Sequence, residues 1–195
     1  LQSVLESPQD IIIFSLDKNY CYTKFTSFHK AIMKKIWGAD IETGGNMLDV
    51  ISSPDDRQKA RANFDRALHG EFFVEEEKYG DEKLYRAFYE NRYSPIKNLE
   101  GEIIGLSVFV IDITKRKKAE EEIQNVKNHF ETLFKISPDA TMITRLPGGE
   151  IVDVNEAFEA GTGHRREDVI GKSTLSTGLW TNTKDRDFFV QTMMK

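Results

Sequence analysis

The sequence contains few of the residues on which disulfide, metal and redox chemistry depend. Its 195 residues include one cysteine, Cys21, and four histidines. A single cysteine excludes a disulfide within the chain and suits a reducing compartment, so we predict a cytoplasmic location. The histidines have no spacing typical of a metal site or of a Cys–His pair. They are His29, His69, His129 and His164.

Long apolar runs and an excess of basic residues are also absent. The longest purely apolar run, Ile11–Phe14, is far shorter than the ~20 residues of a membrane span. The net charge is −5, and the basic run at 115–118 is offset by acidic residues at 120–122, which argues against nucleic-acid binding. Leu1 is no initiator and no basic segment precedes an apolar one, so we predict no signal peptide and interpret the chain as part of a longer protein.

Sequence patterns for catalysis are missing as well. No glycine-rich loop with a following lysine lies between a predicted strand and helix, where it could bind phosphate. Acidic residues are plentiful, but they fall on the surfaces of predicted helices, where a solvated role is expected. We therefore predict that this stretch of chain is not an enzyme.

What the sequence does contain is a regular order of strands and helices. A content of 39% hydrophobic and 30% charged residues is typical of a globular protein. Thr26 or Ser27 can cap a first helix that Gly38 ends, and Ser53-Pro54 begins a second helix. The patterns predict strands at 10–16 and 20–25, helices at 27–37 and 54–69, and strands at 72–79, 84–96 and 102–113. Two strands, then helices, then three strands indicate an α+β fold with one antiparallel sheet.

The apolar spacing changes from a strand period to a heptad period after residue 113. Five residues then recur at alternating spacings of four and three, as in a coiled coil, and we call them the dimer seam: Ala119, Ile123, Val126, Phe130 and Leu133. We predict that this seam pairs with a second copy of the helix in a homodimer. Two heptads alone are marginal, so dimerisation needs the flanking domains too. The alternative is that the seam packs on the chain's own sheet.

The chain also contains an internal repeat. A shift of 130 residues aligns Ser7-Pro8 with Ser137-Pro138 and Phe28 with Phe158. Strands predicted at 140–145 and 150–154, followed by a helix that Asn155 caps, repeat the order found at the start of the chain. The second copy ends before its three C-terminal strands.

Several of these stretches together resemble PAS domains, the sensory modules of bacterial and archaeal signalling proteins. They are Gly101–Gly105, Asp112-Ile113-Thr114 with the basic run and Ala119-Glu120-Glu121, Asn155–Phe158, and 161–172. The resemblance implies a complete PAS domain at 1–114, with a five-stranded antiparallel sheet flanked by helices. It also implies a signalling linker helix at 115–136 and the N-terminal half of a second PAS domain at 137–195.

The resemblance further implies a sensory and regulatory function. We expect part of a sensor histidine kinase of a two-component phosphorelay, whose phospho-accepting histidine and ATP-binding domain lie beyond residue 195. The alternatives are the sensory region of a diguanylate cyclase, or a purely structural dimerisation module with a filled core.

A PAS domain implies a cavity between its sheet and its helices. Strand parity places Ala87, Tyr89, Asn91 and Tyr93 on one face, which we assign to the interior because it lacks full charges. With Asn91 as a lone polar group, such a chamber suits an unknown small ligand held by one or two hydrogen bonds, and a filled core is the alternative. The candidate pocket residues are Phe28, Ile32, Trp37, Met47, Ile51, Phe64, Leu68, Tyr89, Asn91, Tyr93, Val108 and Val110.

The cofactors of known PAS domains can be compared with this sequence. Photosensory flavin domains carry a reactive cysteine in a Gly-x-Asn-Cys setting at a helix start, whereas Cys21 lies in a predicted strand. Their flavin-binding asparagine and glutamine correspond roughly to Glu75, Tyr89 and Val110, which do not match. Haem domains place an axial histidine inside the long helix, which has none before its terminal His69. We therefore expect neither chemistry, while Trp37 and Asn91 leave non-covalent flavin redox sensing open.

The start of the linker helix has an unfavourable order of charges. Basic residues at 115–118 stand at the positive end of the helix dipole, with glutamates after them. Such an order suggests a partner outside the helix, and we predict an Asp112–Arg116 ion pair with Thr114 as the helix cap. The resemblance implies that Asp112 and Thr114 tie the last strand to the helix and pass the signal on. A solvated helix start is the alternative.

Overall fold

The computed structural model describes residues 11–146, 148–180 and 182–193. The chain divides into two compact units, residues 1–120 and 121–195, which are treated separately below. The Ser7-Pro8 part of the predicted repeat lies outside the described residues.

The first unit is built on a five-stranded antiparallel sheet, as the sequence predicts. Its strands are β1 (Ile11–Asp17), β2 (Tyr22–Phe25), β3 (Phe73–Tyr79), β4 (Ala87–Lys97) and β5 (Ile103–Asp112). Their order across the sheet is β2-β1-β5-β4-β3, so the last strand in the chain is the central one. The strand predicted from residue 84 begins three residues later, because residues 82–84 form a turn in which the Asp81 carboxylate accepts a hydrogen bond from the Lys83 amide.

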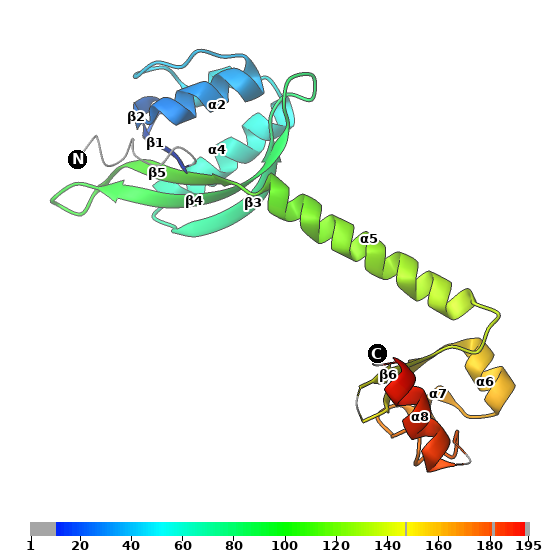
Figure 1. Ribbon diagram of the computed structural model, residues 1–195. Helices are drawn as coiled ribbons and strands as arrows, with labels where there is room; N and C mark the ends of the chain where they lie inside the picture. The colour runs from blue at the N-terminus through cyan, green and yellow to red at the C-terminus, as the bar shows by residue number, and fades with distance from the viewer. Residues whose placement is uncertain (1–10, 147, 181, 194–195) are drawn as a thin grey trace. The chain divides into compact units, whose positions relative to one another are not determined.

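Three helices, α2 (Ser27–Trp37), α3 (Met47–Val50) and α4 (Pro54–Leu68), connect β2 to β3. Figure 1 shows α2 and α4 on one side of the sheet. The predicted caps are present: the Thr26 and Ser53 hydroxyls accept hydrogen bonds from the backbone N–H groups of His29 and Asp56. Gly38 ends α2 with φ +68°, a left-handed conformation that strains residues with a Cβ.

The core of the first unit lies between the helices and the inner face of the sheet. On β4, Ala87, Tyr89, Asn91 and Tyr93 are buried, so the face assigned to the interior is the buried one. The pocket residues predicted on α2 were Phe28, Ile32 and Trp37. The buried residues of this helix are His29, Met33, Ile36 and Trp37, while Phe28 and Ile32 are only half-buried.

A single residue, the buried Ile113, separates the end of β5 from the start of helix α5 (Thr114–Ile136). Four members of the dimer seam are large apolar residues, and each exposes between 53% and 70% of its surface: Ile123, Val126, Phe130 and Leu133. Among the helices of the described residues, α5 included, none is both long and apolar enough to cross a membrane.

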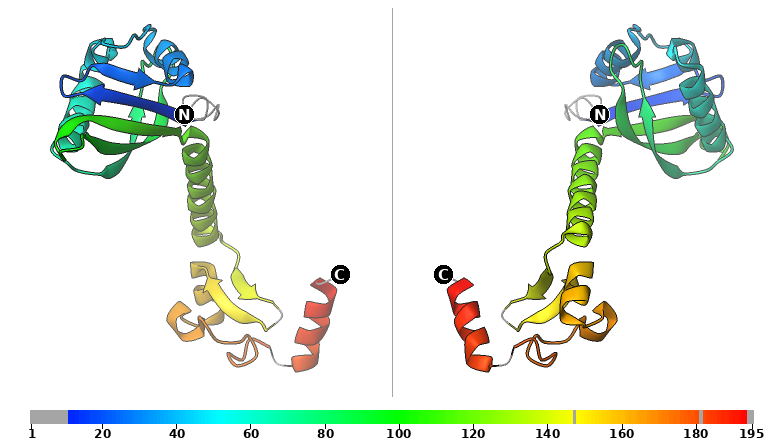
Figure 2. Two further views of the ribbon diagram at one scale, coloured as in Figure 1. Left: turned by 90° about the vertical axis from the view of Figure 1, so that its left-hand side faces the viewer. Right: turned by 90° about the vertical axis from the view of Figure 1, so that its right-hand side faces the viewer.

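The second unit contains a β-hairpin followed by short helices. Its elements are β6 (Met142–Arg145), β7 (Glu150–Val154), α6 (Glu156–Thr162), α7 (Arg166–Val169) and α8 (Thr183–Met193). Figure 2 shows α6 beside the β6–β7 hairpin. Phe158 of α6 packs with Ile151, Val154 and Val169 in a small core. The Asn155 side chain caps α6 as predicted, since its Oδ1 accepts a hydrogen bond from the Phe158 backbone N–H at 2.9 Å.

Candidate ligand cavity and sheet–helix junction

A cavity of about 60 Å³ lies between the inner face of the sheet and helices α2, α3 and α4. Ten of the predicted pocket residues line it: Ile32, Trp37, Met47, Ile51, Phe64, Tyr89, Asn91, Tyr93, Val108 and Val110. Phe28 and Leu68 pack against the surrounding core instead and do not line the cavity. For Phe28 the reason is that α2 presents His29 to the cavity in its place.

Seven residues that line the cavity are absent from the predicted set: Ile12, Phe14, His29, Met33, Ile36, Ala60 and Tyr79. The His29 ring stacks on Phe14 at 4.5 Å between centroids, and its Nε2 lies 3.1 Å from the Tyr22 hydroxyl. Burial lowers the pKa of His29 to about 3, so the imidazole is neutral at physiological pH. The burial of His29 could have been predicted from the spacing of His29, Met33 and Ile36, which is typical of the core face of a helix if histidine is counted as a core residue.

Three buried polar atoms on cavity-lining residues have no hydrogen-bond partner among the described residues. They are His29 Nδ1, Tyr89 Oη and Asn91 Nδ2. A buried polar group without a partner destabilises a fold by about 1–3 kcal/mol, so three around one cavity require an explanation.

Other polar groups beside the cavity do have partners. The Asn63 amide donates hydrogen bonds to the Glu77 carboxylate at 2.8 Å and to the Tyr93 hydroxyl at 3.4 Å. The Tyr79 hydroxyl donates to Glu77 at 2.9 Å, and burial raises the pKa of that carboxyl group. The lack of partners at His29, Tyr89 and Asn91 is therefore not a general property of the polar side chains around the cavity.

The two tyrosines of β4 test the difference between a buried hydroxyl with a hydrogen-bond partner and one without. We expect Tyr89→Phe to raise the free energy of unfolding by about 1 kcal/mol, because it removes a buried hydroxyl without a partner. Tyr93→Phe is the matched control and should lower it by about 0.5–1.5 kcal/mol, because it removes an acceptor for Asn63. Urea unfolding of both variants measures these changes, and equal losses would contradict the assignment.

The cavity does not fit a flavin or a haem. Its volume is far below the ~300–1,000 Å³ of pockets that hold larger organic ligands. Trp37 and Asn91 both line it, but Cys21 does not. His69 follows the end of α4, where its Nδ1 lies 2.6 Å from the Asp65 carbonyl oxygen. Within the described residues no cluster of histidine, cysteine and acidic side chains could hold a metal ion.

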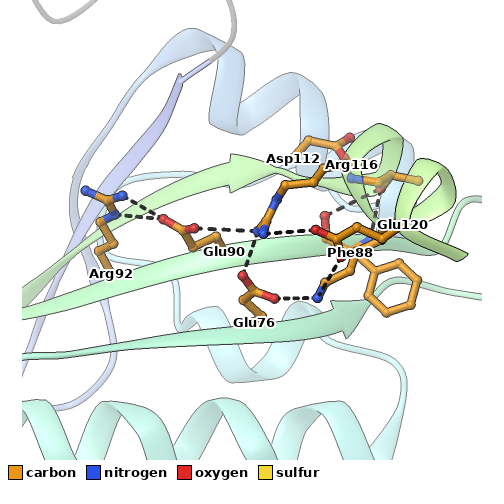
Figure 3. Close-up of polar contacts among 9 residues, drawn as sticks. Glu76, Phe88, Glu90, Arg92, Asp112, Arg116 and Glu120 are labelled. Carbon is orange, nitrogen blue, oxygen red and sulfur yellow. Dashed lines mark hydrogen bonds and ion pairs between the residues drawn. The ribbon is translucent and has the colours of Figure 1, made fainter. Parts of the chain in front are cut away.

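The outer face of the sheet carries a second polar site, where β3 and β4 meet the start of α5. Glu76 and Glu90 lie directly opposite each other in the strand register, an arrangement of like charges that weakens strand pairing. Arg116 lies 2.6 Å from Glu76 and 3.8 Å from Glu90, and Figure 3 shows its side chain extending to both. Lys117 lies 2.6 Å from Glu76. Together with Thr114, we call these residues the junction.

The junction corrects the predicted contacts of the linker helix. The Asp112–Arg116 ion pair is wrong: the Asp112 carboxylate accepts a hydrogen bond from the Thr114 amide at 2.9 Å. Arg116 instead extends to Glu76, on the outer face, whereas Asp112 shares its strand parity with the buried Val110. The alternative of a solvated helix start holds for Lys115 and Lys118, which are exposed, whereas Arg116 and Lys117 are both paired with Glu76.

Thr114 does not cap α5 but is its first residue. Its hydroxyl accepts a hydrogen bond from the Phe88 amide at 3.0 Å, so it bonds the helix to β4 and not to β5, the strand from which the helix emerges. The unusual charge order at 115–118 follows from the same geometry. The sheet carboxylates stabilise cations that the helix dipole disfavours.

Removing the carboxylate of Glu76 should loosen the start of α5. Hydrogen bonds from Lys117 and then Arg116 lower the pKa of Glu76 below its ordinary value of 4.5. A lowered pKa means that the stabilisation is present above about pH 4.5 and is lost as the pH falls through the pKa of the folded state.

We therefore expect Glu76→Gln to speed amide exchange at residues 114–120 at pH 7. Native protein should approach the variant as the pH falls below 4.5. Glu100→Gln, at an exposed loop position, is the control and should have no effect. NMR measurement of amide protection decides the point, and a pH-independent difference would count against the junction.

Comparison with known proteins agrees with this architecture. A family described as "PAS fold" matches residues 42–118, and a family described as "PAS domain" matches residues 128–193. The two matches cover most of the chain and lie in tandem. This chain belongs to the PAS domain family.

Solved structures of similar fold include other PAS-containing proteins. A sensory box histidine kinase/response regulator from Burkholderia thailandensis is 17% identical, with a TM-score of 0.49, over 67% of this chain and 98% of that chain. The PAS domain of Bordetella pertussis BvgS is 15% identical, with a TM-score of 0.48, over 66% of this chain and 94% of that one. The N-terminal domain of a Marinobacter aquaeolei diguanylate cyclase with a PAS/PAC sensor is 12% identical, with a TM-score of 0.44, over 55% and 98%. No curated protein sequence matches the chain.

Proposed function

We propose that this chain is the sensory region of a sensor histidine kinase in a two-component system. Residues 1–114 are the sensing PAS domain, 115–136 the signalling helix, and 137–195 the N-terminal half of a second PAS domain. The first domain detects a small ligand or a redox state in its cavity and passes the change to α5. We assign no catalytic residue to this stretch of chain, and we place it in the cytoplasm.

The observation that carries this proposal is the alternation of contacts along β4. Tyr89 and Asn91 line the cavity with unpartnered polar atoms, while the side chain of Glu90, on the other face, lies 3.8 Å from Arg116 of α5. On the same strand, the backbone N–H of Phe88 donates to the Thr114 hydroxyl. Neighbouring residues of one strand cannot move independently. A ligand that bonds to Tyr89 or Asn91 therefore changes the positions of the groups that hold the helix.

A cavity-filling variant tests the coupling. Ala60 lines the cavity from α4, and Ala62 is exposed on the same helix. Ala60→Val places two methyl groups in the cavity, and we expect it to change amide exchange at residues 114–120. Ala62→Val is the matched control, since it has the same helix-propensity cost and leaves the cavity unchanged.

The coupling also requires the bond between Thr114 and β4. In the double variant Ala60→Val/Thr114→Val the change at residues 114–120 should be reduced, because the hydroxyl that bonds Phe88 is gone. Hydrogen exchange followed by mass spectrometry measures these changes. If Ala60→Val and Ala62→Val behave alike, the first domain is a structural module with a filled core.

The dimer seam on α5 is proposed to form a parallel coiled coil with a second copy of the chain. Ile123 is 70% exposed, and a charge there would be buried in such an interface. We expect Ile123→Asp to yield monomers by sedimentation velocity. Asn125→Asp adds the same charge at an exposed position on the opposite side of the helix and should leave the dimer intact. An unchanged oligomeric state in Ile123→Asp removes the seam from the proposal.

A further inference from the structure

The size of the cavity limits its ligand. A cavity of ~150 Å³ holds benzene, and this one measures about 60 Å³. A molecule with fewer heavy atoms than benzene fits without rearrangement of the core.

The lining also limits the charge of the ligand. No lysine, arginine, aspartate or glutamate is among the described residues that line the cavity. An ion without a counter-charge is strongly disfavoured in such surroundings. His29 supplies no positive charge, because burial holds its pKa at about 3. The ligand is therefore uncharged.

The unpartnered atoms specify the hydrogen-bonding chemistry. The Asn91 amide nitrogen can only donate, so its partner must carry an acceptor lone pair. Tyr89 stands two residues away on the same face of β4, and its hydroxyl can donate as well. One oxygen with two lone pairs can accept from both groups, as a carbonyl does.

A single water molecule at Asn91 and Tyr89 does not fill the cavity, which extends from β4 to His29 beside β1. His29 stacks on Phe14 of β1, and β5 lies between β1 and β4. The backbones of β1 and β4 are therefore about 10 Å apart, at ~4.8 Å per strand. A water between Asn91 and Tyr89 leaves the apolar remainder of the cavity without contacts, whereas a ligand with an apolar part fills it.

Building on the proposed sensory function, we propose that the first PAS domain binds a small uncharged carbonyl compound. Asn91 and Tyr89 donate hydrogen bonds to its oxygen, and its apolar part contacts the ring and aliphatic side chains of the cavity.

Three probes of the same trigonal shape and size separate the alternatives: acetone, acetate and isobutene. Acetone has an uncharged carbonyl oxygen, acetate adds a charge, and isobutene has no acceptor. NMR titration of the whole chain, followed at the Asn91 side-chain amide and at residues of β4, measures binding. We expect acetone to bind at least about tenfold more tightly than either of the others, as a buried hydrogen bond implies.

Variants of the two donors provide the second measurement. Asn91→Leu should weaken acetone binding about tenfold and leave isobutene binding unchanged or tighter. Tyr89→Phe should act in the same direction. Tyr93→Phe is the control, because that hydroxyl also lines the cavity but already has Asn63 as a partner. The amide spectrum of each variant shows whether it is folded.

Comparable binding of isobutene or acetate overturns the proposal, as does a titration in which acetone leaves β4 unchanged and water alone occupies the cavity. Amide exchange at residues 114–120 separates this result from the sensory function. If acetone binds through Asn91 without changing exchange there, the ligand class stands and the sensory coupling fails. If Ala60→Val changes exchange but acetone does not bind, the coupling stands and the ligand class fails.

Discussion

Successive side chains of a β-strand point to opposite faces of the sheet, and in β4 this constraint joins two sites. Tyr89 and Asn91 face the cavity, the side chain of Glu90 faces Arg116 on the opposite side, and the backbone N–H of Phe88 bonds Thr114. No long pathway of side chains is needed between these sites, because the backbone of one strand is common to both. The fold places the first turn of α5 beside β4 even though the helix follows from β5.

The cavity depends on helix α4, which is bonded to the rest of the domain along its length. Near its start the fully buried Asp56 accepts two hydrogen bonds from Arg86, at 2.6 and 2.9 Å, and Arg86 also donates to the Gly80 carbonyl oxygen. Asn63 bonds Glu77 of β3, and Asp65 accepts from the Tyr20 hydroxyl. Removing one partner of a buried ion pair such as Asp56–Arg86 strongly destabilises a fold, so these bonds resist collapse of α4 onto the sheet.

Polar atoms without partners lower the stability of a domain, and here they gather where a ligand can bond them. The neighbouring network of Asn63, Glu77, Tyr79 and Tyr93 shows that the same domain satisfies its other polar groups. A ligand that bonds the unpartnered atoms stabilises the domain more, because these atoms have no hydrogen-bond partner within the protein that the ligand must replace. This is a useful property for a sensor.

The sequence by itself determined the elements and the family. Period-2 and helical patterns and the Thr26, Ser53 and Asn155 caps depend on residues close together in the chain, and the internal repeat compares two such local patterns. Most of the predicted elements agree with the structure to within a few residues. It also identified most of the cavity lining, because strand parity is a local property. On α2 it identified Ile32 and Trp37 but missed His29, since a buried histidine is not distinguishable from an exposed one without its neighbours Phe14 and Tyr22.

Only the tertiary structure decided which charges meet. Glu76 is 40 residues from Arg116 in the chain, and nothing local distinguishes it from its neighbours Glu75 and Glu77. Strand pairing sets the register that brings Glu76 beside Glu90, and strand parity turns both toward α5 while Glu75 and Glu77 face α4. Arg116 also pairs with Glu120 within the helix, but its contact with the sheet is set by distances that exist only once the sheet has formed, which is why Asp112 was the wrong choice.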